Sequence, residues 1–240
     1  HFAQYQHPNP RVIFTTPSHQ QPTGVTMSLS RRQSLLQMAR AHDAWIIEDD
    51  YDSEFRYRGR PLPALSALDS KGRVIYVGTF SKSMFAAMRL GYVVVPKELV
   101  APFSRAKTLL GQGASPVVET AMAGFMNDGR FVEHIRKMRR VYRDRRDVLF
   151  KSLNRSCADY LEPQPTEAGM HMLAWLKNGI NDRRAHQALL DAGVESLPLS
   201  VYAMEPNNRD ALVLGFAGVP ENQIPRLVTR MSKTLSQLVP

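Results

Sequence analysis

The sequence contains a single cysteine, Cys157, among 240 residues, so a disulfide within the chain is excluded. One cysteine is typical of a protein in the reducing cytoplasm, and we interpret it as a packing residue rather than a nucleophile. The sequence also lacks any apolar run near the roughly 20 residues that a membrane-spanning helix needs. Its first residues lack the basic-then-apolar pattern of a signal peptide. These absences predict a cytoplasmic protein without a membrane span.

Helix-turn-helix, zinc-finger and RNA-binding aromatic motifs are absent too, although the net charge is +9. Seven of the cations are interleaved with apolar residues at helical spacing, which predicts one amphipathic helix at about 131–153. We interpret these cations as its solvated face, and contact with DNA stays open as the alternative. They are Arg136, Lys137, Arg139, Arg140, Arg143, Arg145 and Arg146.

Polar residues follow three short apolar segments that predict buried strands. In open α/β sheets, ligands bind beyond the carboxyl ends of the strands, so we expect these polar residues to form a site. The pairs are Val12–Phe14 with the loop 19–24, Trp45–Ile47 with the acidic segment 48–54, and Val74–Val77 with Ser81 and Lys82.

The acidic segment contains five carboxylates that repel one another. A metal site is one interpretation, although no histidine accompanies the acids and we expect no metal. A carboxylate that pairs with a cationic ligand atom is the second, and a solvated loop is the third. The acids are Glu48, Asp49, Asp50, Asp52 and Glu54.

Lys82 is placed for covalent chemistry, because burial at a strand end lowers the pKa of an amine and favours its nucleophilic form. Ser81 and Arg89 supply the hydroxyl and the guanidinium that a phosphate needs. The alternative is a polar turn with a solvent-facing lysine. Together with an acid and a tyrosine at the neighbouring strand end, these groups match the needs of pyridoxal 5′-phosphate (PLP).

The remaining pattern predicts an α/β chain with two domains. We expect a large α/β domain over 1–130, a connecting helix over 131–153 and a small α+β domain over 154–240. Capping-box spacing from Ser30 to Gln33 predicts a helix start, and Pro116 predicts another. Further helices are expected at 97–110, 183–192 and 220–238, and extended segments at 90–95, 170–176, 194–199 and 211–217.

Three motifs resemble the aminotransferase-like domain of MocR-type (GabR-like) regulators of the GntR superfamily. These proteins share the fold-type-I architecture of PLP-dependent aminotransferases. Weaker matches at Arg136–Arg146 and Pro198–Ser200 extend the resemblance over essentially the whole chain. The three motifs are Thr-Pro-Ser-His-Gln-Gln-Pro-Thr-Gly at 16–24, Ile-Glu-Asp-Asp-Tyr-Asp-Ser-Glu-Phe at 47–55, and Gly-Thr-Phe-Ser-Lys at 78–82 with Arg-Leu-Gly-Tyr at 89–92.

The resemblance implies a role for each matching residue. Lys82 would form the Schiff base with PLP, Asp49 would pair with the pyridine nitrogen and Tyr51 would bond the ring hydroxyl. Ser81 and Arg89 would hold the phosphate. His19 or Gln21 would supply any further contact to the ring, because Gln21 stands where most fold-type-I enzymes have asparagine.

Two departures from the family pattern bear on activity. The arginine that binds a substrate carboxylate in aminotransferases is replaced by Val213 in the matching segment, which removes the main bidentate partner of an α-carboxylate. The segment 83–88 also lacks the usual Pro-Gly, so the phosphate loop is expected to differ in shape. The sequence therefore favours a sensor of PLP or of another effector over an enzyme. The alternative is a PLP-dependent aminotransferase that acts on amino acids and 2-oxo acids.

The resemblance also implies partners outside this sequence. Members of the family carry an N-terminal winged-helix DNA-binding domain, and their PLP-binding fold begins upstream of the first strand seen here. We therefore expect a chain that starts within the domain, with a homodimer in the full-length protein. The effector would be PLP itself or a small amine, amino acid or vitamin B6 compound.

Overall fold

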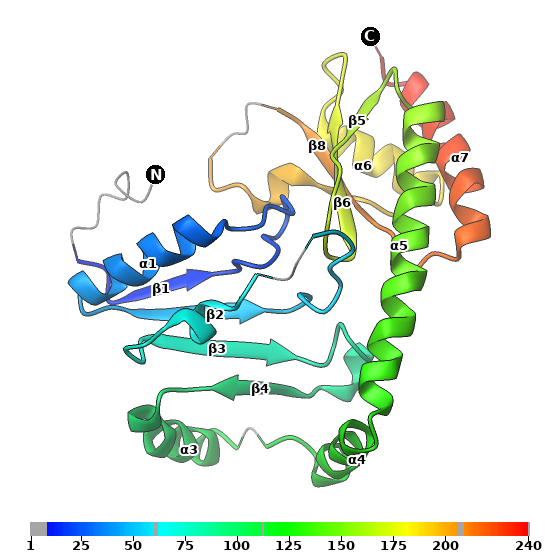
Figure 1. Cartoon of the computed structure of the whole chain (residues 1–240). Helices are drawn as coiled ribbons and strands as arrows, with labels where there is room; N and C mark the ends of the chain where they lie inside the picture. The colour runs from blue at the N-terminus through cyan, green and yellow to red at the C-terminus, as the bar shows by residue number, and fades with distance from the viewer. Residues whose placement is uncertain (1–8, 60–61, 112, 206–208, 240) are drawn as a thin grey trace. The chain divides into compact units, whose positions relative to one another are not determined.

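The computed structural model describes residues 9–59, 62–111, 113–205 and 209–239. The chain separates into two compact units. The first contains most of the chain up to Ile135, and the second begins at Arg136 and includes the earlier segments Pro22–Gly24 and Phe55–Gly59. Each unit has its own four-stranded sheet (Figure 1). No helix within the described ranges is long and apolar enough to cross a membrane.

The sheet of the first unit has its four strands in sequence order. The first three are parallel, and the fourth pairs antiparallel with the third. Because three neighbouring strands run the same way, their carboxyl ends lie at one edge of the sheet (Figure 1). All three predicted strands are present. The strands are β1 (Val12–Thr15), β2 (Trp45–Asp50), β3 (Val74–Thr79) and β4 (Gly91–Val94).

The helix α1 (Leu29–Ala41) connects β1 to β2 and buries Leu35, Leu36 and Ala39 in a core shared with β2 and β3. The predicted cap at Ser30 is wrong. Ser28 has the extended backbone of an N-cap, and its Oγ accepts a hydrogen bond from the Arg31 backbone nitrogen at 3.4 Å. The helix therefore starts one residue before Ser30.

The other helical segments of the first unit follow the expected order. Pro116 occupies the first turn of its helix, as predicted. The segments are α2 (Leu65–Leu68), α3 (Val100–Leu109), α4 (Pro116–Asn127) and the 3-10 turns Ala86–Met88 and Lys97–Leu99.

Several apolar side chains of the first unit are exposed. The prediction that β1 is buried is wrong for Val12 and Phe14, which are 56% and 65% exposed. An apolar run indicates a strand but does not say which of its faces is covered. Leu109, at the end of α3, and Val117, in α4, are more exposed still, at 87% and 77%.

The second unit has an antiparallel sheet in the order β5-β6-β8-β7. The extended segment predicted at 194–199 is reduced to two residues of strand, followed by a 3-10 turn at Leu199–Tyr202. A second 3-10 turn lies at Glu221–Gln223. The strands are β5 (Leu161–Pro163), β6 (His171–Leu176), β7 (Leu197–Pro198) and β8 (Ala211–Gly215), and the helices that follow α5 are α6 (Asp182–Asp191) and α7 (Ile224–Ser236).

The basic helix α5 spans Arg130–Ser156. The expectation that all seven of its cations are solvated is wrong. Arg146 is buried, and its guanidinium donates to the carbonyl oxygen of Thr166 at 3.2 Å and lies over the ring of Tyr57. Arg145 donates to the carbonyl oxygen of Ala217. A guanidinium can bury its flat face against an aromatic ring, which charge counting along a helix does not reveal.

Cys157 is fully buried in the core of the second unit. Burial raises the pKa of its thiol to about 11. A protonated, enclosed thiol has little nucleophilic character, so the position suits a packing residue.

Candidate functional site

The ends of three parallel strands carry the residues that the sequence singled out. His19 and Gln21 follow β1, Tyr51 follows β2, and Lys82 follows β3. The register pairs Asp49 with Val77 and Asp50 with Gly78, so the polar segments after β2 and β3 leave the sheet side by side. This is the edge at which ligands bind in open α/β sheets.

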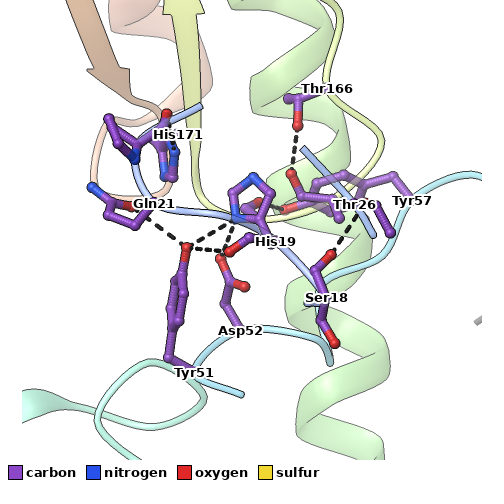
Figure 2. A network of polar contacts seen from close by, with 12 residues as sticks. Ser18, His19, Gln21, Thr26, Tyr51, Asp52, Tyr57, Thr166 and His171 are labelled. Carbon is purple, nitrogen blue, oxygen red and sulfur yellow. Dashed lines mark hydrogen bonds and ion pairs between the residues drawn. The ribbon is translucent and has the colours of Figure 1, made fainter. Parts of the chain in front are cut away.

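A network of polar contacts joins the loop after β1 to the segment after β2 (Figure 2). The Tyr51 hydroxyl donates to the carbonyl oxygen of His19 at 2.8 Å and lies 3.3 Å from His19 Nδ1. Gln21 Oε1 lies 3.5 Å from the same hydroxyl. The structure thus brings together three predicted residues, with Tyr51 at the centre.

Asp52 joins this network through His19. Its Oδ2 atom lies 2.9 Å from His19 Nδ1, and both side chains are buried, with 2% and 0% of their surfaces exposed. In the sequence, Asp52 is one of five crowded acids, and no pattern predicts a role for it. Its contact joins residues 33 positions apart, so no local pattern could have revealed it.

The base of the loop after β1 is held by Arg32, a fully buried residue of α1. Its guanidinium donates to the carbonyl oxygen of Pro17 at 2.7 Å, of Met27 at 3.0 Å and of Pro63 at 3.1 Å. The backbone nitrogen of Met27 also donates to the Pro17 carbonyl at 2.9 Å. Arg32 therefore closes both ends of the loop that carries His19.

Glu48 is the counterion of Arg32, with its Oε1 atom 3.9 Å from the guanidinium. It accepts hydrogen bonds from the backbone nitrogens of Leu65 at 2.7 Å and Ser66 at 2.9 Å. Burial raises the pKa of Glu48, and these two donors oppose the rise. This carboxylate thus supports the scaffold behind the site.

The two adjacent aspartates of β2 face opposite ways, as strand alternation requires. Asp50 is buried and accepts from the hydroxyls of Tyr76 and Ser53, both at 2.8 Å. Asp49 is half-buried on the other face. Burial raises the pKa of Asp49, and the charges of Asp50 and Asp52 raise it further.

The pKa values of two tyrosines near Asp50 are also raised. Burial raises the pKa of Tyr76, and the Asp50 carboxylate adds to the rise. Burial likewise raises the pKa of Tyr92. Both phenols are therefore protonated at neutral pH, and Tyr76 acts as a hydrogen-bond donor to Asp50.

Lys82 lies exposed in the turn after β3, which differs from the burial that the strand end suggested. The strand itself is buried at Val74 and Ile75, but the chain leaves the sheet before the lysine. Within the described residues, the Lys82 side chain has no hydrogen bond or ion pair. Its amine is therefore open to a ligand at the sheet edge.

The turn that carries Lys82 is tied to Arg89 by the backbone. The nitrogen of Phe80 donates to the carbonyl oxygen of Leu90 at 3.0 Å, which joins the residues that precede Ser81 and follow Arg89. Arg89 is exposed and has the left-handed backbone, with φ of 49°. Side chains with a Cβ rarely adopt this conformation, so the arginine is held there at a cost.

Two residues that sequence analysis missed hold this turn. Thr79 Oγ1 accepts from the backbone nitrogen of Ser81 at 3.1 Å. The Nε2 atom of His134 lies 2.9 Å from the carbonyl oxygen of Ser83, next to the lysine. A threonine at a strand end could have signalled such a turn, whereas His134 lies 51 positions away and could not.

Among the described residues, no group of three or more His, Cys, Asp or Glu side chains could hold a metal ion. The structure instead gives Glu48, Asp50 and Asp52 separate partners in the protein. Arg56, which follows the acidic segment in the sequence, pairs with Glu167 at 3.1 Å in the second unit.

Val213 lies in β8 of the second unit. Its side chain is 5% exposed and belongs to a small apolar cluster with Leu173, Leu199 and Ala211. A valine in this packing offers no charge to an anionic ligand. The position therefore contributes to the core of its own sheet.

Known proteins are similar to this chain in fold and in sequence. The chain matches the family described as aminotransferase class I and II over residues 3–231. It is 42% identical to the probable rhizopine catabolism regulatory protein MocR of Rhizobium meliloti, covering 88% of this chain and 43% of that protein. It is 30% identical to aromatic-amino-acid aminotransferase 1 of Thermococcus litoralis, covering 95% of this chain and 54% of that protein.

A solved structure agrees with these sequence matches. LysN, the α-aminoadipate aminotransferase of Thermus thermophilus, complexed with N-(5′-phosphopyridoxyl)-L-leucine, superposes with a TM-score of 0.87 at 25% identity, over 96% of this chain and 60% of that chain. The chain spans about half the length of the curated relatives it matches. The expected fold-type-I architecture and the resemblance to MocR-type regulators are both confirmed. The chain belongs to the aminotransferase class I and II family.

Proposed function

We propose that this chain is the PLP-binding, effector-sensing domain of a MocR-type transcription regulator. The observation that carries the proposal is that an acid, a tyrosine and a lysine lie at or directly after the ends of β2 and β3, two strands that pair in the sheet. These are the groups that PLP needs, and family membership supports the same reading.

The residues present fit this cofactor. Asp49 is a half-buried carboxyl group whose pKa is raised in the cofactor-free chain. A cationic pyridine nitrogen beside it would lower that pKa, and the ionised carboxylate would in turn keep the nitrogen protonated. Tyr51 would bond the ring hydroxyl, and Ser81 and Arg89 would supply a hydroxyl and a guanidinium for the phosphate. Lys82 offers an accessible amine, which would condense with the aldehyde and release water. When bound, PLP supplies an electron sink for an attached amine.

We assign sensing rather than turnover as the main role. At Val213 the chain has a buried aliphatic side chain where the family pattern places the arginine that binds a substrate carboxylate. Without a bidentate guanidinium there, an amino acid loses its main anchor. PLP itself, or a small amine, amino acid or vitamin B6 compound held in another way, is therefore the proposed effector.

The partners of the full-length protein are part of the same proposal. The relative MocR is described as a regulatory protein, and DNA would be bound through a winged-helix domain of the full-length protein. We further propose a homodimer, because Leu109 and Val117 are exposed apolar residues of a kind that interfaces cover. The protein would work in the cytoplasm. Light scattering after size-exclusion chromatography tests the dimer.

The proposed domains are a large PLP-binding domain over 1–130, a connecting helix over 131–153 and a small domain over 154–240. The cofactor residues Asp49, Tyr51 and Lys82 all belong to the first of these, as do His19 and Gln21. The small domain would transmit or complete the response.

Titration with PLP tests the cofactor proposal. Wild-type chain should develop an absorbance band near about 420 nm that survives removal of free PLP. Lys82→Ala should abolish the band while the chain stays folded by circular dichroism. Lys71→Ala, an exposed lysine before β3, is the matched control and should keep it. A wild-type chain without the band, or a band that persists in Lys82→Ala, contradicts the proposal.

The second candidate is a PLP-dependent aminotransferase, which the similarity to the Thermococcus litoralis enzyme favours. A single-turnover experiment separates the two. Adding amino acids to the PLP-loaded protein would convert the band to that of pyridoxamine phosphate if the chain is an enzyme. The sensing role predicts no conversion on the time scale of minutes with any of the twenty amino acids.

A further inference from the structure

Asp52 and His19 form a buried pair directly behind the tyrosine of the proposed site. We propose that Asp52 is a positioning residue: through His19 it fixes the Tyr51 hydroxyl and so sets the group that meets the ring of the cofactor. This inference rests on the proposed function for the cofactor. The contacts among the three residues are present in the chain without it.

The first step is the contact between the two buried side chains. A carboxylate 2.9 Å from Nδ1 favours a proton on that nitrogen, which fixes the tautomer and the plane of the imidazole. His19 has almost no exposed surface, so its ring cannot turn away without opening the loop. Asp52 therefore determines where His19 sits.

The second step leads from His19 to Tyr51. The hydroxyl donates its single proton to the His19 carbonyl at 2.8 Å, and the ring nitrogen lies 3.3 Å from the same oxygen (Figure 2). The two rings are tilted by 46° with their centres 6.2 Å apart. Main chain and side chain of one residue thus hold the hydroxyl, and that residue is held by Asp52.

The third step concerns what else fixes the loop. Arg32 binds the carbonyl oxygens of Pro17 and Met27, which are the two ends of the loop. The Gln20 nitrogen also donates to the Val25 carbonyl at 3.0 Å. These contacts set the base, whereas the pair of His19 and Asp52 ties the loop to the end of β2. Removing Asp52 should therefore release Tyr51 without unfolding the loop.

Asp50 provides a matched control. It lies two residues before Asp52, is also buried, and accepts from Tyr76 and Ser53. A purely structural role for a buried acid predicts that Asp50→Asn and Asp52→Asn behave alike. A positioning role predicts that Asp52→Asn alone reproduces the behaviour of Tyr51→Phe.

The main experiment measures PLP affinity and the pH midpoint of the Lys82-dependent band in these variants. Asp52→Asn should weaken binding about 10-fold and shift the midpoint in the same direction as Tyr51→Phe. Asp50→Asn should change affinity less than about threefold. In a Tyr51→Phe background, Asp52→Asn should add no further shift, because its effect passes through the hydroxyl.

A second measurement does not need the cofactor. Hydrogen exchange at the backbone nitrogen of Gln20, the neighbour of His19, should speed up in Asp52→Asn, whereas exchange at Met27, at the base held by Arg32, should not change. Asp50→Asn should leave both unchanged. Equal effects of the two variants on exchange and on binding overturn the inference, as does a full additional shift in the Tyr51→Phe background. A wild-type chain with no Lys82-dependent band contradicts the proposed function instead, and the exchange rates then decide alone whether Asp52 holds the loop.

Discussion

The two sides of the candidate site are built differently. On the side of β1 and β2, His19 is buried and its ring and carbonyl are bonded, and Arg32 closes the base of its loop. On the side of β3, Lys82 and Arg89 are exposed, and Arg89 has a left-handed backbone. One side is a packed scaffold, and the other is a turn held mainly by backbone hydrogen bonds.

The two sides differ in what they do for a ligand: one holds a side chain in a fixed position, and the other keeps a side chain accessible. A group that must be held in one position benefits from packing and from a second layer of hydrogen bonds, as Tyr51 does. A lysine that must meet an incoming ligand needs access, and an exposed turn supplies it. The strain at Arg89 also lies on the open side, where strained residues are often found at binding sites. Substitutions on the side of β1 and β2 should therefore mainly lower stability, whereas substitutions on the side of β3 should mainly weaken cofactor binding.

The largest expected effect is the loss of stability in Arg32→Ala, which removes the residue that holds the side of β1 and β2. The variant leaves Glu48 buried without its counterion and removes the Arg32 hydrogen bonds to three carbonyl oxygens, so the free energy of unfolding should fall by about 3–5 kcal/mol. Urea denaturation followed by circular dichroism measures it. Arg32→Lys keeps the charge but fewer donors and should lose less. A fall below about 1 kcal/mol for Arg32→Ala would refute the scaffold role.

The next largest effect is expected at Gly78, near the end of β3. A Cβ at Gly78 would lie 2.3 Å from a ring carbon of Tyr92, so Gly78→Ala should cost about 1–3 kcal/mol by overpacking. Adding Tyr92→Ala should recover part of this loss, because the ring is then absent. Gly124→Ala, in an open position of α4, is the control and should stabilise the chain by about 1 kcal/mol. Thermal unfolding of the three variants and the wild type checks the order.

The strand pattern of the site could be predicted from the sequence because it depends on local order. Apolar segments followed by polar residues mark strand ends, and parallel strands bring those ends to one edge, so Tyr51 and Lys82 were expected near each other. The choice of Asp49 came from the resemblance, and alternation in β2 agrees with its facing away from Asp50.

The contacts that hold the site could not be predicted in the same way. The pairing of His19 with Asp52 and the burial of Arg32 join segments that are distant in the sequence, and they depend on packing rather than on spacing. The exposure of Lys82 depends on where the chain leaves the sheet, which a run of apolar residues does not reveal. Burial of Arg146 was missed for a related reason, since its partners Tyr57 and Thr166 lie on other segments.

A smaller effect of opposite sign is expected on the open side. Arg89→Gly removes the strain of a φ of 49° and should raise the free energy of unfolding by about 0.5 kcal/mol. The same variant should weaken PLP binding by more than about 10-fold, because the phosphate loses its guanidinium. Arg105→Gly, in the exposed interior of α3, should instead lower stability by about 1 kcal/mol. Destabilisation by Arg89→Gly would mean that the arginine is held by contacts rather than strained.

The smallest expected effect is at Asp49, where stability and cofactor binding oppose each other. Burial and the charges of Asp50 and Asp52 raise the pKa of Asp49 above 3.8, so the folded chain binds its proton more tightly than the unfolded chain. The ionised acid therefore costs stability as pH rises from about 3.8 through the raised folded pKa, and this cost is absent at lower pH. Asp49→Asn should stabilise the cofactor-free chain at pH 7 by about 0.5 kcal/mol and should have no effect on stability at pH 3. It should also weaken PLP binding, because a neutral amide cannot pair with a protonated pyridine nitrogen. Asp159→Asn, at an exposed position, should change neither property. Urea denaturation at both pH values, with PLP titration at pH 7, shows whether Asp49 is held in the fold for a ligand rather than for stability.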